Sequence, residues 1–364
     1  MRFDLSFDIA RILIVVLRAG TTQIASSTLK LVIGFAYLGV SMIRRRRSLA
    51  LAAAVIGGPF VSARAQAWPT QAIKLVVTFP PGGSSDIVAR LIGPALADRL
   101  GQSVVVDNRP GGAATIGAAA VARAAPDGYT LLMSNSAPLS ISPAMMEKPL
   151  YDPLKSFRHL LYVGDVPTVI VTHPSIPVTD FASFVAWAKT QKDPIPFGSG
   201  GQASVGHIVG ELLAQKLGLK MAHVPYKGAG PMRSDLLGGQ IKMAIDALPQ
   251  NLQFRRSGQL RLVAVTAAKR VAQASDLPTV VELGHPELVA ENFVGISAPA
   301  GLVPAVEVPL LRALNQVMAL PDIRSKLEGQ GFELEQRSPD AFAAFIKEQA
   351  DRWAPVVRAS GARL

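Results

Sequence analysis

The feature of this sequence that most limits its fold is the alternation of strand-like and helix-like segments from Trp68 onward. The run IKLVVTF (73–79) precedes a helical pattern over 86–100, and SVVVDN (103–108) leads into an alanine-rich helical stretch at about 115–125. Strands that alternate with helices are typical of α/β proteins whose mainly parallel sheets are covered by helices on both faces. Neither a fixed-period repeat nor a low-complexity linker divides this part of the chain, so composition marks no domain boundary.

The same alternation continues to the C-terminus. We expect a helix over 180–189, with Thr179 as its N-cap. Further strands are expected within 126–134 after a turn, and at 160–166, 168–173, 195–200, 219–226, 241–247, 260–267 and 293–300. Further helices are expected at 204–217, 304–319, 321–329 and 338–357.

The charge of the chain is concentrated near its N-terminus. The whole chain carries a formal charge of +11, of which residues 1–67 contribute +7 and the remainder +4. The remainder has no dense Lys/Arg run and no basic residues interleaved with aromatics, so we expect no nucleic-acid binding. The chain contains no cysteine, which excludes disulfides, thiolate catalysis and cysteine-based metal sites.

Residues 42–67, MIRRRRSLALAAAVIGGPFVSARAQA, have the plan of a secretory signal peptide. Four arginines precede an apolar stretch at 49–61, and small residues at Ala65 and Ala67 would allow cleavage before Trp68. The apolar stretch is short for a bilayer span. We therefore expect export to the periplasm, by either the ordinary secretory route or the twin-arginine route.

Residues 1–41 do not fit that plan. Their two apolar runs, 9–17 and 31–40, are each too short to span a bilayer comfortably. Two interpretations stay open. Either Met42 is the real start of translation, or the first 41 residues are a genuine membrane-associated extension.

The stretch TFPPGGSSD (78–86) connects a predicted strand to a predicted helix. Such a loop lies at the carboxyl edge of a sheet, where ligands of α/β proteins bind. Gly82 and Gly83 allow positive φ and a close approach to a ligand, while the serines and Asp86 can cap the helix. The free N–H groups of a helix start suit a carboxylate or a phosphate. The loop matches neither phosphate motif, G-x-x-x-x-G-K-[ST] or G-x-G-x-x-G, and without a ligand it would serve as a tight turn with a cap.

A second turn repeats this composition. In FGSGGQASVGHIVGELL (197–213), a strand, a glycine-rich loop and small polar residues again lead into a helix. Two such turns facing each other would hold a small anion from both sides. Recognition of a carboxylate by helix ends needs no arginine, and neither loop contains one.

These turns belong to a longer series of motifs. The series includes WPTQAIKLVVTFPPGGSSDIVARLIGPAL, VVVDNRPGGAATIGA, APDGYTLLM, YDPLKSF, GSGGQASVGHIVGELL, HVPYKGAGPMRSDLLGGQIKMAIDAL, GQLRLVAVT, LPTVVELGHPEL, FVGISAPAGLVP and RWAPVVRASG. In this order, the chain resembles the periplasmic substrate-binding proteins of tripartite tricarboxylate transporters, the Bug-type receptors. The resemblance covers essentially all of 68–364. It departs where the family usually reads PGAGG and this chain has PGGAA (110–114).

The resemblance implies two α/β lobes of the type II periplasmic-binding fold that close on a small organic acid. We expect lobe 1 to comprise 68–170 and 292–364, and lobe 2 to comprise 171–291. The resemblance also implies a first loop that holds one carboxylate through N–H groups and water, a second loop with a histidine behind it, an acidic residue at the ligand's distal end, and a wall after the third strand. In that order, the implied residues are Phe79, Pro81, Gly82, Gly83, Ser84 and Asp86; Ser199, Gly200, Gly201, Gln202, Ser204 and His207; Asp246; and Ser134, Asn135 and Ser136.

The resulting hypothesis is an exported receptor that performs no chemistry and acts as a monomer. It would bind a mono-, di- or tricarboxylate and deliver it to a membrane permease, or serve a sensor. We expect no cofactor and no metal, because the histidines lack metal-ligand spacing. The rivals are a periplasmic hydrolase-like enzyme that uses Ser204 or Asp246, and a cytoplasmic α/β enzyme. A triad of Ser204, His207 and Asp246 is disfavoured because the chain has no G-x-S-x-G elbow.

Overall fold

The computed structural model describes residues 68–364. The expected signal peptide and the two interpretations of residues 1–41 lie outside the described residues and stay predictions. Among the helices of 68–364, none combines the length and the apolar character that a bilayer crossing requires.

The elements alternate as the sequence predicts. The strands are β1 (Ile73–Val77), β2 (Val104–Asn108), β3 (Thr130–Asn135), β4 (Phe157–Thr172), β5 (Ile195–Ser199), β6 (Met221–Pro225), β7 (Met243–Ala247), β8 (Arg261–Val265), β9 (Glu291–Pro299) and β10 (Glu333–Leu334). The α-helices are α4 (Ser84–Leu100), α5 (Thr115–Ala122), α6 (Phe181–Thr190), α7 (Val205–Leu217), α8 (Ala229–Leu237), α9 (Leu252–Arg256), α10 (Pro304–Met318), α11 (Pro321–Gly329) and α12 (Pro339–Ser360).

The sheet is built from two halves with the same strand order. The first half reads β2-β1-β3-β9-β4, and the second reads β6-β5-β7-β4-β8. In each half, the strand that comes first in the chain (β1 or β5) pairs in parallel with the next two strands (β2 and β3, or β6 and β7). The strand that enters from the other half (β9 or β4) pairs antiparallel with its neighbour. The expectation of mainly parallel sheets is therefore wrong: the sheet is mixed, because two strands pass between the halves.

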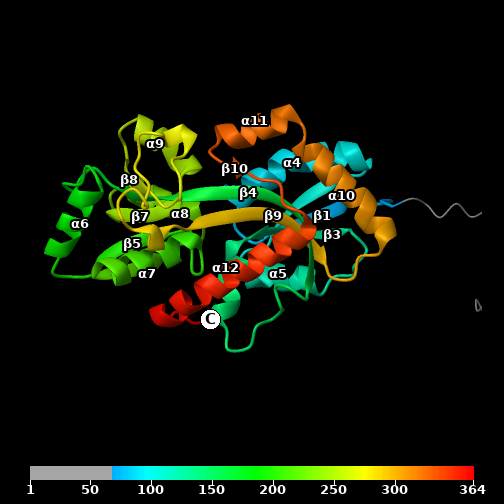
Figure 1. Ribbon diagram of the computed structural model, residues 1–364, viewed down its shortest axis with the longest axis horizontal. Helices are drawn as coiled ribbons and strands as arrows, with labels where there is room; N and C mark the ends of the chain where they lie inside the picture. Colours follow the sequence, from blue (N-terminus) through cyan, green and yellow to red (C-terminus); the bar gives the residue numbers. More distant parts are fainter. Residues whose placement is uncertain (1–67) are drawn as a thin grey trace, which may run out of the picture. The chain divides into compact units, whose positions relative to one another are not determined.

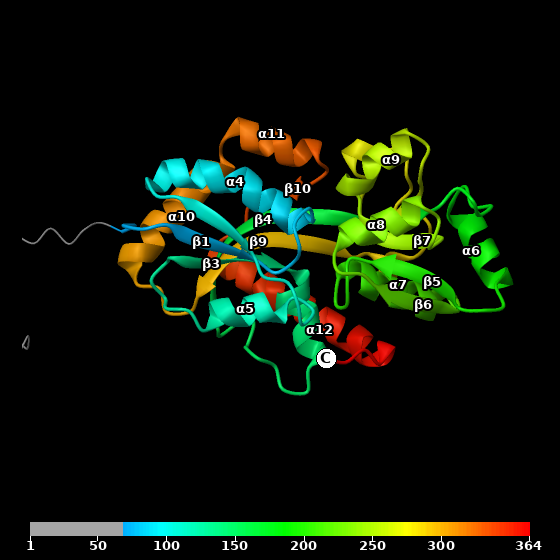
Figure 2. The same ribbon diagram turned by 180° about the vertical axis from the view of Figure 1, so that it is seen from behind.

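Strands β4 and β9 connect the two halves, and they run side by side from one to the other (Figures 1 and 2). The sequence predicts two strands, 160–166 and 168–173, where the structure has the single strand β4. The first part of β4 pairs with β9 as far as Pro167, β7 pairs with it from Thr168 onward, and β8 pairs with it from Val169 onward. At Gly164, which has a φ of 151°, a Cβ would lie 2.1 Å from the carbonyl oxygen of Glu333, so glycine allows β10 to pair with β4 at this point.

We call the half with α4, α5, α10 and α11 lobe 1, and the half with α6, α7, α8 and α9 lobe 2. Each has its own apolar core. Helix α12 serves both lobes: Phe342 packs with lobe 1 side chains such as Phe293, whereas Trp353 packs with the α7 side chains of lobe 2. The expected division at 170 and 291 stays a prediction. The apolar face of α12, which that division assigns to lobe 1, contacts both cores.

Local sequence explains where the lobe 2 helices begin. Helix α6 starts at a capping box, in which Asp180 accepts from the Ser183 N–H and the Ser183 hydroxyl accepts from the Asp180 N–H. The cap expected at Thr179 is therefore one residue too early. Helix α7 starts after Ser204, whose hydroxyl accepts from the His207 N–H, and ends at Gly218 in the left-handed conformation.

Candidate functional site

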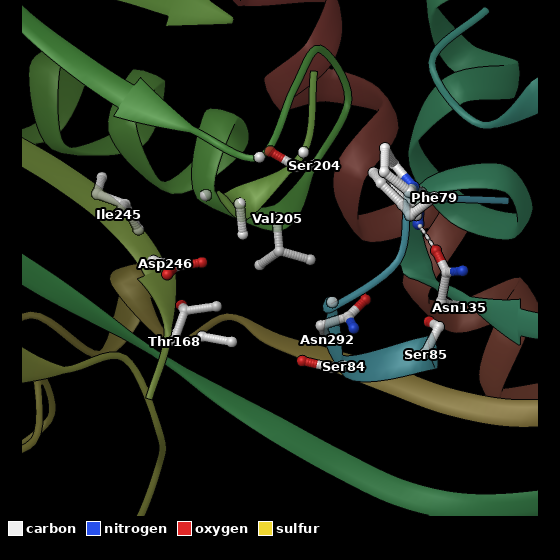
Figure 3. A pocket seen from close by; sticks show the side chains of 18 residues that line it. Phe79, Ser84, Ser85, Asn135, Thr168, Ser204, Val205, Ile245, Asp246 and Asn292 are labelled. Carbon is white, nitrogen blue, oxygen red and sulfur yellow. Dashed lines mark hydrogen bonds between the residues drawn. The ribbon is translucent and has the colours of Figure 1, made fainter. Parts of the chain in front are cut away.

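A cavity of about 100 Å³ lies between the two lobes. A buried water needs roughly 10–15 Å³ on this scale, so the cavity has room for several waters or one small organic molecule. Figure 3 shows Phe79, Ser85 and Asn135 on one side of it and Ile245, Asp246 and Thr168 on the other. The residues that line it are Phe79, Pro80, Gly83, Ser84, Ser85, Asn135, Ala137, Thr168, Gly200, Ser204, Val205, Gly206, Gly228, Ala229, Ile245, Asp246, Ala247 and Asn292.

The first turn presents the start of α4 to this cavity. Gly83 is the N-cap, and no side chain caps the helix, so the N–H groups of the first turn are open to a ligand. Gly82 adopts a φ of 87° and donates its N–H to the Asp86 carboxylate at 3.0 Å. The Gly82 amide expected to hold the ligand is therefore engaged within the protein.

Asp86 holds the first turn together instead of contacting the cavity. Its carboxylate accepts from Arg90 at 2.9 Å and from Asn108 at 3.0 Å, besides the Gly82 amide. Burial opposes its ionisation, but these hydrogen bonds prevail and hold the pKa of Asp86 below its usual value. Asp86 is thus an anchor that fixes the loop conformation.

The second turn presents the start of α7. The Ser204 hydroxyl is occupied by the His207 N–H, which leaves the Val205 and Gly206 amides at the cavity wall. A Cβ on Gly206 would lie 2.2 Å from the Ile245 carbonyl oxygen, so only glycine allows α7 to approach β7 this closely. Ala203, just before the helix, has a φ of 61°, which is strained for a non-glycine residue.

A buried polar network supports this second turn from behind. The Ser199 hydroxyl contacts His223 Nε2 at 2.7 Å, accepts from the Ser204 hydroxyl at 3.1 Å and bonds the Gly201 backbone. The His223 ring stacks on His207 with 3.9 Å between ring centroids. Burial lowers the pKa of His207 to about 4 and that of His223 to about 3, so both rings are neutral near pH 7.

A third helix start, which the sequence analysis missed, also reaches the cavity. Gly228 is the N-cap of α8, has a φ of 102° and lacks a side-chain cap; with Ala229 it lines the cavity. The signal was present in VPYKGAG (224–230), a strand, glycine and helix series like the other two. Its conspicuous residue is Lys227, which is exposed and does not line the inner cavity.

A second hollow of about 280 Å³ adjoins the cavity and shares Phe79, Pro80, Gly200 and Gly228 with it. Gly201, Gln202 and Lys227 line only this outer hollow. A Cβ on Gly228 would meet Pro80 Cγ at 3.2 Å, so the two lobes are in close contact where the hollows join.

The predicted site residues fall into three groups. Those that line the inner cavity are Phe79, Gly83, Ser84, Asn135, Gly200, Ser204 and Asp246. Those that line only the outer hollow are Gly201 and Gln202. Those that line neither are Pro81, Gly82, Asp86, Ser134, Ser136, Ser199 and His207.

The third group supports the site from outside. Pro81 and Gly82 are exposed, because the turn points their atoms to solvent. Ser134 contacts Ser297 at 2.6 Å, and the Ser136 hydroxyl accepts from the Phe293 N–H, so both tie β3 to β9. Lining residues that sequence reasoning missed include Thr168 and Asn292, which come from the strands that pass between the lobes.

The structure does not assemble the hydrolytic triad. The Ser204 hydroxyl donates to Ser199, and His207 Nδ1 accepts from the Ala203 N–H at 3.3 Å. Asp246 accepts from Arg233 and Asn251. Each member is thus engaged elsewhere, and His207 Nδ1, which would have to accept the Ser204 proton, accepts instead from the Ala203 N–H.

One hydrogen bond joins the lobes beside the cavity. Gln250 of lobe 2 donates from Nε2 to the Ser84 hydroxyl of lobe 1 at 3.2 Å. A hydrogen bond contributes about 0.5–1.5 kcal/mol, and this one stabilises the closed state that binds the ligand. Gln250→Ala is therefore expected to weaken ligand affinity roughly 2- to 10-fold without unfolding either lobe. Calorimetric titration measures the affinity. Gln253→Ala, on the exposed side of α9, is the matched control, and equal affinities of both variants would contradict the role of Gln250 in closure.

Two lobes that exchange strands and enclose one cavity between facing helix starts define the class of two-lobed solute-binding proteins. Within this class, the sequence model described as "Tripartite tricarboxylate transporter family receptor" matches residues 88–362. The chain belongs to this receptor family.

Individual proteins and solved structures that are similar to this chain support its family membership. The chain is 38% identical over 301 residues to "Protein BugT" of Bordetella pertussis, which covers 82% of this chain and 92% of the relative. It is similar to the structure "R. palustris Rpa4515 with adipate", with 32% identity, a TM-score of 0.76 and coverage of 82% and 100%. It is also similar to MatC from Rhodopseudomonas palustris with bound malate, with 29% identity, a TM-score of 0.75 and coverage of 80% and 100%.

Proposed function

We propose that this protein is an exported receptor that captures a small organic carboxylate between its lobes and presents the closed form to the membrane subunits of a tripartite transporter. The protein acts in the periplasm, as a monomer, and does not convert its ligand. Similar receptors were solved with adipate and with malate, both carboxylates, which supports this ligand class.

The observation that carries the proposal is the meeting of three helix starts at one cavity. Gly83 and Ser84 of α4, Val205 and Gly206 of α7, and Ala229 of α8 all line it, whereas no lysine or arginine among residues 68–364 does. Helix starts carry unpaired N–H groups and a partial positive charge, which together bind an anion such as a carboxylate. Because the ligand contacts both lobes, its binding energy favours the closed state.

A ligand screen by thermal unfolding tests this function. The protein is first freed of co-purified ligand by unfolding and refolding, and is then melted with mono-, di- and tricarboxylates, with sugars and divalent cations as controls. A carboxylate at 100 times its Kd should add about 2.7 kcal/mol to the free energy of unfolding. After incubation with the protein, the NMR spectrum of the carboxylate should show no product. Stabilisation by sugars or cations but by no carboxylate would overturn the ligand class, and product formation would overturn the receptor role.

A further inference from the structure

The outer hollow lies on the solvent side of the inner cavity. Residues within 78–80 and 110–114 of lobe 1 and within 200–202 and 226–228 of lobe 2 line it, so both lobes form its walls. Its lining includes the exposed Pro110 and Lys227, whereas the inner cavity is lined by buried residues such as Ser85 and Asn135. A small molecule that passes from solvent through the outer hollow therefore arrives at the inner cavity.

The passage between the two hollows is narrow. Pro80 of lobe 1 and Gly228 of lobe 2 line both hollows. They lie so close together that a Cβ on Gly228 would meet Pro80 Cγ at 3.2 Å. In the closed form this contact stands between the inner cavity and Lys227, and a carboxylate passes it when the lobes part.

Lys227 is the single charged side chain among the described residues that line the outer hollow. It directly precedes Gly228 and is exposed. Among residues 68–364, its amine has no carboxylate within 4.0 Å. The Asp235 carboxylate of α8 accepts from the hydroxyl of Tyr226 at 2.8 Å instead. The positive charge of Lys227 therefore faces the hollow without a neutralising partner.

The helix starts cannot supply attraction at this distance from the cavity. Their partial charges act mainly within the first turn of a helix. A full charge acts in solution over about one Debye length, which is about 10 Å at an ionic strength of 0.1 M. Since no lysine or arginine of residues 68–364 lines the inner cavity, Lys227 is the full positive charge that an anion meets on this route.

We propose that the carboxylate enters through the outer hollow and that Lys227 attracts it there, so that Lys227 raises the association rate without contacting the bound ligand. This inference rests on the proposed function and adds a residue that acts on the rate of capture. A charge at the rim of a binding site changes the association rate and its salt dependence, whereas a buried contact changes the dissociation rate.

Lys227→Gln tests this role, because glutamine keeps most of the length of the side chain and removes the charge. Rates of succinate binding are measured by stopped-flow tryptophan fluorescence, in the range where the observed rate rises linearly with concentration. If succinate does not bind, the carboxylate with the largest thermal shift in the screen replaces it. At an ionic strength of 0.01 M, where the Debye length is about 30 Å, the association rate should fall about three- to tenfold. At 1 M, where the Debye length is about 3 Å, it should fall less than about twofold, and the dissociation rate should change less than about twofold at either salt concentration.

Two further variants isolate the charge and its position. Lys227→Arg keeps the charge and should keep the association rate within about twofold of the unmodified protein. Lys189→Gln is the matched control, because Lys189 is an exposed lysine of lobe 2 that lines neither hollow and lies in α6, at the outer end of the lobe (Figure 1). It causes the same change in net charge and should leave both rates unchanged.

The outcomes separate the two proposals. If no carboxylate of the screen binds, the proposed function fails. If a carboxylate binds but Lys227→Gln leaves its association rate unchanged at 0.01 M, or lowers it equally at 1 M, only the inference about Lys227 fails. An equal loss in Lys189→Gln would also overturn it, because the effect would then come from net charge. A rise in the dissociation rate that exceeds the fall in the association rate would make Lys227 a contact of the bound ligand and would contradict its role in entry.

Discussion

Gly206→Ala is expected to eliminate most ligand binding and to destabilise the protein by about 1–3 kcal/mol or more, as overpacked interiors are. The new Cβ would lie 2.2 Å from the Ile245 carbonyl oxygen and 3.1 Å from its carbon. Both atoms belong to the backbone of β7, a buried strand, and cannot turn away as a side chain can. The start of α7 must therefore move from the sheet, and its amides leave the position from which they reach the cavity.

Thermal unfolding and ligand titration of Gly206→Ala measure the two effects. Loss of hydrogen bonds to a charged ligand should lower affinity about tenfold or more. Gly230→Ala is the matched control, because it lies in the first turn of α8 and its Cβ would meet nothing within 4 Å. The control should keep its affinity, and a Gly206→Ala protein with unchanged melting temperature and affinity would contradict the close packing of α7 on β7.

Glu291→Gln is expected to stabilise the protein at pH 8 and to change its stability little at pH 5. Burial raises the pKa of Glu291 to about 8, with smaller contributions from the nearby Asp165 and Glu333 carboxylates. Between about pH 4.5 and pH 8 the unfolded chain therefore loses this proton while the folded protein keeps it. The unfolded state binds fewer protons in that window, so the free energy of unfolding falls as pH rises, by an amount on the order of a few kcal/mol.

Glutamine does not titrate, so its free energy of unfolding does not fall in this way. The variant should therefore be more stable than the unmodified protein by a margin that grows from pH 5 to pH 8. Melting temperatures across that range measure the margin. Glu282→Gln is the opposite control: hydrogen bonds from Arg270 and the Thr279 N–H lower the pKa of Glu282, so this variant should gain no stability at pH 8. A margin for Glu291→Gln that is constant or shrinks toward pH 8 would contradict the account.

Two of the three helix starts at the cavity could be predicted from the sequence because the two halves of the sheet repeat the same local pattern. The first strand of each half ends in a glycine-serine turn that opens a helix, once before Ser84 and once before Val205. This composition is unusual enough to be noticed in both places. The second strands lead to α5 and α8. The turn before α8, VPYKGAG, contains glycines but no serine, and its conspicuous residue, Lys227, does not line the inner cavity, so the α8 start at Gly228 was missed.

Some of the expected site residues do not line the cavity, because sequence does not fix the direction of a side chain. Asp86 reads as a cap or a ligand contact, yet its carboxylate turns to Arg90 and Asn108. His207 faces the stacked His223 ring, which has no motif around it that suggests a role. Both predictions required knowledge of which residues lie behind the loops, and that depends on strands far apart in the chain.

The path of β4 was misread for a different reason. Gly164 and Pro167 interrupt the apolar run and usually mark the end of a strand. In the structure, pairing is irregular near Gly164, and Pro167 lies where the partners of β4 change from β9 and β10 to β7 and β8. The same passage places Thr168 and Asn292 in the cavity wall, and neither belongs to a recognisable motif.

The structure also accommodates the PGGAA sequence (110–114), which stands where the family usually has PGAGG. Ala113 and Ala114 have φ values of 51° and 71°, in a region where glycine is favoured. Ala114 is buried and is the N-cap of α5, and the Ala113 carbonyl accepts from the Ser142 hydroxyl. The strained conformation is therefore held by its surroundings.

In the proposed function, the starts of α4, α7 and α8 bind one carboxylate between the lobes. Amide ¹H–¹⁵N spectra during titration with a carboxylate from the screen test it most directly, because a hydrogen bond to a carboxylate shifts the amide proton that donates it. Large shifts that saturate together are expected at the amides of Ser84, Ser85, Val205, Gly206 and Ala229. Saturable binding that leaves these amides unchanged, with the largest shifts elsewhere, would contradict it.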